Sequence, residues 1–557
     1  MKKMITMGGC CWLAFLLFSG SLSAQSADFK TGRSIDLFHS ILREVAVFYV
    51  DTVQISELVD AGIASMLEQL DPYTEFFPEE DESIEMMTTG AYGGVGAYIK
   101  KTPQGVIFSE PYEGSPAAKA GIVSGDLILE IDGVPATEFS GDECSNRMKG
   151  MPGTEVRFKV KKIKTGAAVD LVIKRERIRF PDIPYYGIVG DGIGYIYIKT
   201  FTVGGGQELR NAFLELKATG KMSKLVLDLR GNGGGPVEEA VNMLGLFLPR
   251  ATEVFAVKGR YAQQHQTYKT KEEPLDVHIP IVVLVNRGSA SSSEILTGAI
   301  QDLDRGVVLG TRTFGKGLVQ RIVPLNYNTK LKITIGKYYT PSGRCVQAID
   351  YSHRNEDGSV GYIPDSLIKA FKTSAGRLVY DGGGITPDMV IEPDGFTSRV
   401  AIELISRGLI RDYAILYFAA HESIAAPEHF TLTDSEYDDF TTFMEQQELF
   451  TNRSATQAML EQLVATAKRE GYDTLFVQQL NDVKKSAAGN KAKDLLRHKA
   501  ELKRLLEEEI SSVYYFQKGG IRSTLRDDIQ LNNAIEILSD PRKYQRLLTP
   551  QTGTSLP

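Results

Sequence analysis

Two segments of this chain share one order of parts: an aliphatic run, a turn of small residues, and then a helical pattern. The first is KLVLDLRGNGGGPVEEAV at 224–241, and the second is IPIVVLVNRGSASSSEILTGAIQDL at 279–303. Short aliphatic runs of this kind are typical of strands buried on both faces. Strand and helix patterns alternate over 176–396, which predicts a layered α/β core with a largely parallel sheet. We expect its strands at 192–198, 224–230, 279–286 and 306–310, followed by a hairpin of 318–325 and 331–339.

The first 24 residues differ in composition from the rest of the chain. Lys2 and Lys3 precede the apolar run CCWLAFLLF, and small residues follow it as far as Ala24. This order predicts a secretory signal peptide at 1–24, because the apolar run is too short to span a bilayer comfortably. The mature chain is then expected outside the cytoplasm.

Three further parts surround the predicted core. Helical spacing predicts an N-terminal helical segment at 28–89, interrupted where Pro72 and Pro78 occur. Residues 90–175 have the alternating patterns and tight turns of a compact β-rich domain. Residues 397–557 have helical patterns without a motif that we can connect to chemistry, so we expect a helical accessory domain. A chain of 557 residues is long enough for this many domains, and its net charge of −7 does not indicate a nucleic-acid-binding surface.

Cysteine and histidine spacing does not indicate a metal site. Outside the predicted signal peptide the cysteines are Cys144 and Cys345, and we expect two unpaired thiols rather than one bridge. Zinc spacings and H-E-x-x-H motifs are absent from the sequence. We therefore expect no metal and no cofactor.

The serine cluster at 289–293 stands where a strand pattern changes to a helical one. A serine hydroxyl is a weak nucleophile until a base takes its proton, and the unpaired N–H groups of a helix start can stabilise the resulting oxyanion. In the other segment, Gly233, Gly234 and Gly235 can present backbone amides to an anion. Each feature taken alone also fits an ordinary helix cap or a tight turn.

Lys316 lies between two glycines in GTRTFGKGLVQ and is a candidate base. To accept a proton near neutral pH its pKa must fall from about 10.4 to roughly 7–8, which requires burial. Gln320, four residues on and on the same face of a strand, is a candidate partner. A phosphate-binding loop would need Ser or Thr where Gly317 stands. A histidine base is another alternative, and the seven histidines are His39, His265, His278, His353, His421, His429 and His498.

Several of these motifs, in this order, resemble those of the C-terminal processing (tail-specific) serine proteases. The resemblance covers about 36–393 and leaves the helical C-terminal part unmatched. It is carried by LDPYTEFF, YGGVGAYI, GSPAAKAGIVSGDLILEIDG, VLDLRGNGGG, RGSASSSEILTGAIQD, GTRTFGKGLVQ, KYYTPSGR and GGGITPDMVIEP. It implies a multidomain α/β protein: a crotonase/Clp-like layered serine protease core at 176–396, a PDZ domain inserted at 90–175, and helical N- and C-terminal parts.

The resemblance also implies roles for individual residues. The second serine of the S-A-S-x-S run is the nucleophile in that family, which is Ser291 here. The lysine of F-G-K-G is the general base, here Lys316, and the glutamine four residues on, here Gln320, supports it. The oxyanion hole is similar to one formed by backbone amides of the glycine loop and of the residue after the nucleophile, which here are Gly235, with Gly234 beside it, and Ser292. Relatives commonly have alanine where Ser292 stands, and only the backbone N–H is required.

The PDZ-like part implies how substrates are chosen. Such domains bind a peptide's free carboxylate in a nest of loop amides and add its chain as an extra strand. Gly94, Val95, Gly96 and Ala97 are the expected carboxylate loop. The implied function is an endopeptidase of the bacterial periplasm or envelope that binds unfolded or tailed proteins and cleaves them through an acyl-enzyme. An adaptor or a second copy bound through the helical regions is a further expected partner.

Two other readings stay open from the sequence. One is a catalytically inactive scaffold that binds peptides through its PDZ domain, although the expected catalytic residues are all present. The other is a Ser-His-Asp esterase, which would depend on one of the histidines. A degradation assay separates the first from a protease, and replacement of the histidines separates the second.

Overall fold

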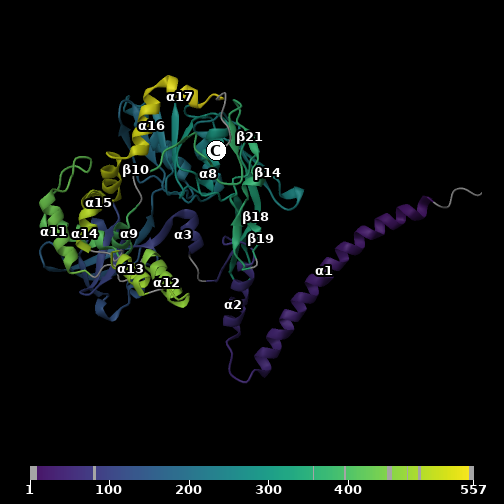
Figure 1. The fold of residues 1–557 in the computed structure, drawn as a ribbon, viewed down its shortest axis with the longest axis horizontal. Helices are drawn as coiled ribbons and strands as arrows, with labels where there is room; N and C mark the ends of the chain where they lie inside the picture. The colour runs from purple at the N-terminus through teal and green to yellow at the C-terminus, as the bar shows by residue number, and fades with distance from the viewer. Residues whose placement is uncertain are drawn as a thin grey trace, which may run out of the picture. The chain divides into compact units, whose positions relative to one another are not determined.

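Figure 1 shows the computed structural model of the chain. The aliphatic runs of the two starting segments form neighbouring parallel strands. The structure describes residues 9–79, 83–355, 357–393, 397–447, 455–472, 474–486 and 491–550. The chain forms two compact units: one comprises Met1–Glu79 and Gln320–Thr334, and the other comprises Glu80–Val319 and Ile335–Pro557.

The centre of the larger unit is a six-stranded sheet in the order β10-β11-β12-β15-β16-β23. β10 pairs antiparallel with β11, and the other neighbours are parallel. The predicted α/β core and its four predicted strands are therefore confirmed. The strands are β10 (Tyr185–Val189), β11 (Ile193–Tyr197), β12 (Lys224–Asp228), β15 (Ile281–Val285), β16 (Val307–Gly310) and β23 (Met389–Val390).

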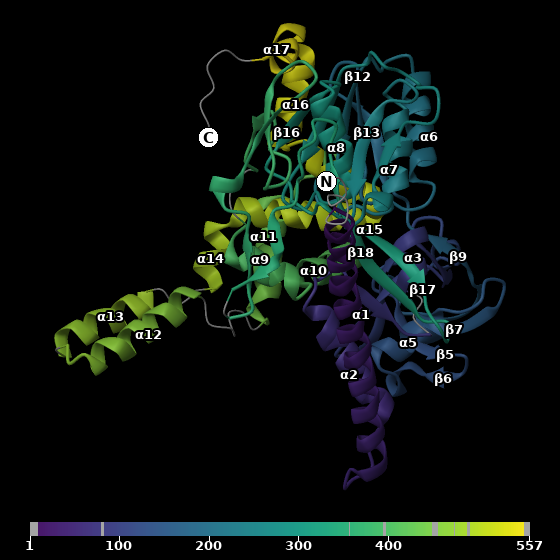
Figure 2. The ribbon, with the colours of Figure 1, turned by 90° about the vertical axis from the view of Figure 1, so that its right-hand side faces the viewer.

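Helices cover both faces of this sheet, as parallel strands require. One face packs against α6 (Gly205–Ala218), α7 (Val237–Gly245) and α8 (Ser292–Asp302). The opposite face packs against α16 (Ile529–Ser539) and α17 (Pro541–Leu547), which come from the end of the chain (Figure 2). The core is thus completed by residues more than 130 positions beyond its last strand.

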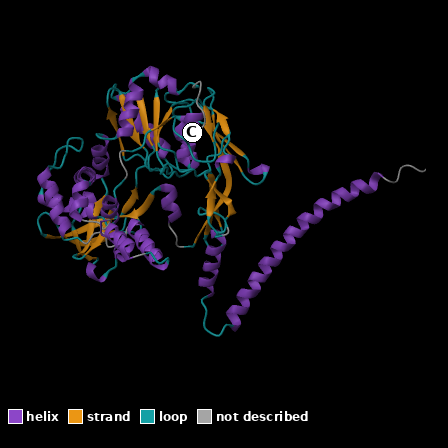
Figure 3. Cartoon of the chain, in the orientation of Figure 1, coloured by secondary structure: helices purple, strands orange, loops and turns teal. Residues whose placement is uncertain are grey.

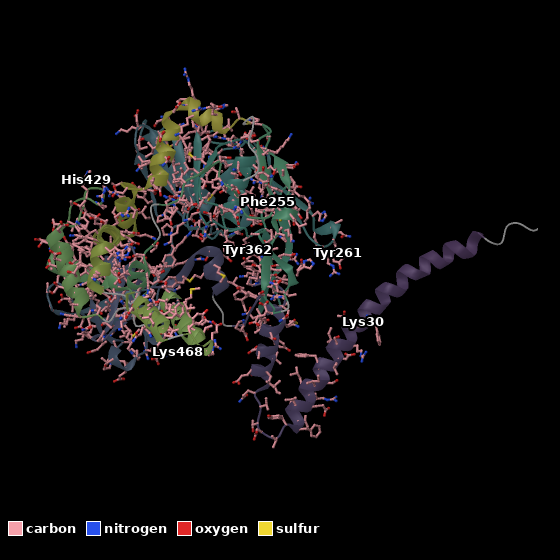
Figure 4. All side chains as sticks on the ribbon, viewed as in Figure 1. Lys30, Phe255, Tyr261, Tyr362, His429 and Lys468 are labelled. Carbon is pink, nitrogen blue, oxygen red and sulfur yellow. The ribbon has the colours of Figure 1, made fainter. Side chains whose placement is uncertain are left out.

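A second sheet lies next to α8 and carries β13 (Glu253–Lys258), β14 (Gln266–Lys269) and the end of β18 (Lys330–Tyr339). Figure 4 labels Phe255 of β13 among the side chains. Phe255 is buried, and its ring centroid lies 4.3 Å from that of Tyr268. Short pieces complete this region: η2 (Ala262–Gln264), β19 (Ile349–Arg354), β20 (Val360–Tyr362), η3 (Asp365–Leu367), β21 (Ala370–Lys372) and β22 (Leu378–Tyr380).

Residues 91–179 form the predicted β-rich domain. Its main sheet has the order β3-β4-β5-β7-β8, with β6 paired to β5, and β2 pairs with β9. Ser115 caps α4 and Pro116 begins it. The elements are β2 (Ala91–Gly94), β3 (Ala97–Thr102), β4 (Gly105–Pro111), α4 (Pro116–Lys119), β5 (Leu127–Ile131), β6 (Val134–Pro135), η1 (Ala136–Glu138), α5 (Gly141–Met148), β7 (Glu155–Lys161), β8 (Ala168–Lys174) and β9 (Glu176–Arg179). A short helix, α3 (Ser83–Thr89), precedes them.

The region after 397 is helical, as predicted (Figure 3). α12 and α13 lie side by side as a hairpin (Figure 2). α10 and α15 pack together and also contact the β-rich domain, where Lys100 Nζ lies 2.6 Å from Asp412 Oδ1. The helices are α9 (Arg399–Ser406), α10 (Leu409–Ala420), α11 (Asp434–Glu445), α12 (Ala455–Arg469), α13 (Thr474–Ser486), α14 (Lys491–Arg497) and α15 (Lys499–Leu525), followed by α16 and α17.

The smaller unit contains α1 (Gly9–Phe48), α2 (Ile55–Glu68) and β1 (Glu75–Phe77), which pairs with the first part of β18 (Lys330–Tyr339). β17 (Leu318–Pro324) pairs with β18, so the predicted hairpin is confirmed. Residues 1–8 of the predicted signal peptide lie outside the described residues, and 9–24 are part of α1. Among the described helices, none combines the length and apolar character that crossing a bilayer requires.

Candidate active site

The backbone changes direction sharply between β15 and α8, and Ser291 stands at this turn. Ser291 is the N-cap of α8 with φ 54° and ψ −115°, in a region that residues other than glycine rarely occupy. Its carbonyl accepts hydrogen bonds from Glu294 N at 2.8 Å and Ile295 N at 2.9 Å. Ser291 is 9% exposed, and every residue of α8 is buried. A rigid helix start therefore holds this serine just below the surface.

The other serines of the cluster bind the glycine-rich loop. The hydroxyls of Ser289, Ser292 and Ser293 donate to the carbonyls of Leu229, Gly235 and Asn232 at 2.8, 2.6 and 2.9 Å, respectively. These bonds hold the loop against the nucleophile turn. Ser289 and Ser293 therefore have structural roles.

Gly234 and Gly235 have conformations that other residues would not tolerate. Gly234 has φ 93°, and a Cβ there would lie 2.8 Å from Ser291 Cβ and 2.9 Å from Ser292 N. Gly235 has φ 156°, and a Cβ there would lie 1.9 Å from Phe201 O. The loop thus passes directly against the start of α8.

The hydrogen bonds of the loop distinguish its amides. Gly234 N donates to Asn232 Oδ1 at 2.8 Å, so this N–H group is already used. Gly234 O accepts from Phe201 N at 3.3 Å. Because C=O and N–H point in opposite directions across a trans peptide, the N–H of Gly235 points away from Phe201. The geometry therefore favours Gly235 over Gly234 as an oxyanion donor.

Glu294 connects the nucleophile turn to the loop that carries Lys316. Its Oε2 accepts from Ser291 N at 3.0 Å and from Lys316 N at 2.8 Å. Its Oε1 accepts from Thr313 Oγ1 at 2.6 Å and from Gly315 N at 2.7 Å. Burial raises the pKa of the Glu294 carboxyl, and these hydrogen bonds act in the opposite direction. One carboxylate oxygen thus brings together the main chains of Ser291 and Lys316.

The loop at 311–317 packs tightly, which explains its glycines. Gly315 has φ 88°, and a Cβ there would lie 2.4 Å from Ala348 Cβ. A Cβ at Gly317 would lie 2.7 Å from Gln347 N. Lys316, between them, is half-buried. The loop leads into β17 rather than into a helix, so it lacks the helix N-terminus of a phosphate-binding loop.

Gln320 is the remaining catalytic candidate, and it belongs to the smaller unit. Its Nε2 donates to Thr334 Oγ1 at 3.1 Å, and Thr334 N in turn lies 3.3 Å from Thr74 Oγ1. Its support of Lys316 stays a prediction. The two cysteines expected to be unpaired, Cys144 and Cys345, are free.

The expected carboxylate loop of the β-rich domain has its amides on one side. The carbonyls of Val95 and Gly96 accept from Ala117 N at 2.9 Å and from Tyr112 N at 3.0 Å. By the planarity of the peptide, the N–H groups of Gly96 and Ala97 point the opposite way. Gly96 has φ 77°, and a Cβ there would lie 2.5 Å from Ser115 Cβ. This arrangement suits an anion.

β3 follows this loop directly and is an edge strand of the main sheet as the structure describes it, paired with β4. An edge strand presents unpaired backbone groups to which an extended peptide can add. α5 lies next to β3. The loop, the strand edge and the helix together could therefore hold a peptide end.

Sequence reasoning missed Glu294 as the residue that connects the two catalytic segments. A glutamate three positions after the N-cap is an ordinary capping signal. Its bonds to Thr313, Gly315 and Lys316 depend on how two loops meet, and the local pattern does not contain that information.

Comparisons with known proteins agree with this arrangement. Residues 192–353 match the model of peptidase family S41, residues 107–162 match that of the PDZ domain, and residues 400–538 match "Probable PDZ-protease, C-terminal helical domain". The carboxy-terminal-processing protease of Bartonella bacilliformis is 32% identical over 352 residues, which cover 62% of this chain and 80% of that protein. The chain belongs to the carboxy-terminal-processing protease family.

A second member of this family, from Synechocystis sp., is 33% identical over 315 residues, which cover 55% of this chain and 70% of that protein. Among solved structures, the photosystem II D1 C-terminal processing protease aligns with 63% of this chain and 86% of its own, at 26% identity and a TM-score of 0.34. Membership in the carboxy-terminal-processing proteases makes the chain a serine-type peptidase with a PDZ domain.

Proposed function

We propose that this protein is a secreted endopeptidase that binds the free C-terminal tails of unfolded proteins through its PDZ domain and cleaves them with Ser291 and Lys316. The observation that carries the proposal is the shared bond to Glu294: the backbone amides of Ser291 and Lys316 both donate to its Oε2. This bond supports the proposal, because the loop that carries Lys316 lies beside the turn that carries Ser291.

The proposed chemistry has two steps. Neutral Lys316 takes the proton of the Ser291 hydroxyl, which attacks the scissile carbonyl, and the amides of Gly235 and Ser292 hold the oxyanion. Lys316 then gives its proton to the leaving amine. Water, deprotonated by the same lysine, hydrolyses the ester and releases Ser291. The reaction needs no metal and no cofactor.

Tail recognition would use the loop amides of Gly94, Val95, Gly96 and Ala97 for the carboxylate and the free edge of β3 for the chain that precedes it. Secretion to the periplasm or cell envelope rests on the signal-peptide pattern of residues 1–24. An adaptor or a second copy as partner stays a prediction.

The test uses one unfolded substrate with an apolar C-terminal tail, offered with a free or an amidated C-terminus. We expect Ser291→Ala and Lys316→Ala each to lower kcat/KM by at least about 10³-fold, because the nucleophile and its base act as a unit. We also expect the amidated substrate to be cut more slowly by the native chain.

Lys271→Ala is a matched control, since Lys271 is an exposed lysine elsewhere in the same domain, and it should cleave normally. Full activity of Ser291→Ala or Lys316→Ala would refute the assignment. If the native chain binds the tail without cutting it, the inactive-scaffold alternative is correct.

A further inference from the structure

Arg230 opens the glycine-rich loop, and its side chain is held from two sides. Its Nε donates to Asp228 Oδ1 at 2.9 Å, at the end of β12. On the other side its Nη1 donates to Asp528 Oδ1 at 3.0 Å and its Nη2 to Asp528 Oδ2 at 2.5 Å. Nη1 also donates to Gln530 Oε1 at 3.0 Å. The guanidinium therefore joins the loop to the beginning of α16, almost 300 residues further along the chain.

This ion pair differs from the exposed pairs that contribute little. The exposed fractions of the Arg230, Asp228 and Asp528 side chains are 19%, 2% and 14%. The contact with Asp528 is bidentate, because two guanidinium nitrogens donate to its two carboxylate oxygens. Such a pair fixes the relative orientation of the two side chains as well as bringing their charges together. Removing one partner would leave the remaining charges shielded from water and incompletely paired.

The position of Arg230 affects the site because the loop is short. Leu229 directly precedes Arg230, and its carbonyl accepts a hydrogen bond from the Ser289 hydroxyl. Asn232 follows two residues after Arg230, and its carbonyl accepts from the Ser293 hydroxyl and from Ala290 N. Asn232 Oδ1 in turn accepts from Gly234 N. Gly235 is only five residues after Arg230. A displacement of Arg230 is therefore expected to displace the Gly235 amide as well.

We propose that Asp528, at the end of the chain, is a positioning residue for peptide cleavage: through Arg230 it sets the glycine-rich loop so that the Gly235 amide faces the oxyanion. The inference rests on the proposed function, in which that amide stabilises the transition state. Because Asp528 is proposed to act on the loop through Arg230, its effect should appear in kcat and not in tail binding.

The key variant is Asp528→Asn. Asp528 also caps α16, since its Oδ1 accepts from Leu531 N at 3.0 Å, and asparagine is an equally good N-cap. The variant thus keeps the helix cap and removes one of the two carboxylate charges that pair with Arg230. We expect kcat to fall about tenfold, because small displacements of catalytic groups have effects of this size. KM and the binding of a tail peptide should stay within about twofold of the native values.

Asp540→Asn is the matched control. Asp540 caps the neighbouring helix α17 through Arg542 N and Lys543 N, so the same change occurs at a helix start that does not contact the loop. Asp540→Asn should leave kcat unchanged. Asp528→Glu restores the carboxylate, so its kcat should lie between that of Asp528→Asn and the native value. Thermal unfolding of every variant is measured beside the kinetics.

Three outcomes would overturn the inference: a kcat of Asp528→Asn within about twofold of native, an equal loss in Asp540→Asn, or loss of folding in both Asp528→Asn and Asp528→Ser. The last result would give Asp528 a role in the fold alone. Ser291→Ala is assayed in parallel. If Ser291→Ala stays active, the proposed function fails; if it is inactive while Asp528→Asn is fully active, only the positioning role fails.

Discussion

Backbone conformation separates Ser291 from the other serines of its cluster. Its φ of 54° is one of seven positive values among the non-glycine residues that the structure describes. A non-glycine residue in a sparsely populated region costs on the order of 1–3 kcal/mol, so the surrounding contacts must hold it there. The bond from Ser291 N to Glu294 and the buried helix that follows supply those contacts. Strain of this kind at one serine is consistent with a nucleophile.

Gly96 gives a residue-level test of tail recognition. We expect Gly96→Ala to weaken binding of a peptide with a free C-terminus by at least about tenfold, because the new methyl group would meet Ser115 and the φ of 77° disfavours a side chain. The loop would have to move, and its amides would move with it. Fluorescence anisotropy with a free and an amidated peptide measures the effect.

Gly133→Ala is the control for this variant. Gly133 lies in a turn of the same domain with φ 81°, but a Cβ there would meet nothing within 4 Å. It carries the same backbone penalty without the collision, so its affinity for the peptide should be nearly native. Equal losses in both variants would show that domain stability, not the carboxylate loop, determines binding.

The positions of α8 and of the loop at 311–317 relative to each other depend on Glu294, which binds both. Glu294→Gln keeps the size of the side chain but replaces one carboxylate oxygen by an NH₂ group. That NH₂ donor would face the N–H or O–H donors that now bind the oxygen, so no hydrogen bond could form there. We expect a loss of stability of about 2–4 kcal/mol, since a buried group is left unsatisfied, and a kcat at least about tenfold lower. Chemical denaturation and steady-state kinetics measure the two effects.

Glu143→Gln provides the comparison. Glu143 occupies the same third position of its helix, α5, and accepts from Ser140 N at 2.6 Å, but it lies in the PDZ domain. Its replacement should leave kcat at the native value. A native kcat in Glu294→Gln would show that the alignment of Ser291 and Lys316 does not need this carboxylate.

Local patterns were sufficient to predict the strands and turns of these elements. The aliphatic runs at 224–228 and 281–285 form strands where the sequence predicts them, because apolar patterning acts over a few residues. The bonds that Glu294 makes to the loop at 311–317, and those that Arg230 makes to Asp528 and Gln530, could not be predicted in this way. They join residues 19 to 300 positions apart, whose proximity depends on packing of whole layers.

At the level of the whole molecule, the C-terminal region was predicted to be an accessory domain, yet its last two helices belong to the core. Leu531, Ala534, Ile537 and Leu538 of α16 pack on the apolar face of the central sheet, against residues such as Val282. A helical pattern alone does not show which surface a helix covers. The core is therefore not complete without α16 and α17.

A truncation after Leu525 tests this conclusion. It removes 32 residues, 526–557, and exposes the sheet face formed by residues such as Val226, Val282 and Leu284. Burying one such side chain contributes about 1.5–3 kcal/mol, so losing this layer outweighs the roughly 5–15 kcal/mol net stability of a typical domain. We expect an insoluble product, or one without a cooperative thermal transition.

Replacing residues 455–486, the α12–α13 hairpin, with a short Gly-Ser linker removes the same number of residues and serves as the comparison. Met459, Leu463 and Leu475 of this hairpin are already largely exposed, so its removal should leave a soluble chain that unfolds cooperatively. Soluble yield and calorimetry distinguish the two deletions. If the chain ending at Leu525 unfolds cooperatively within about 5 °C of the full-length protein, then α16 and α17 are accessory after all.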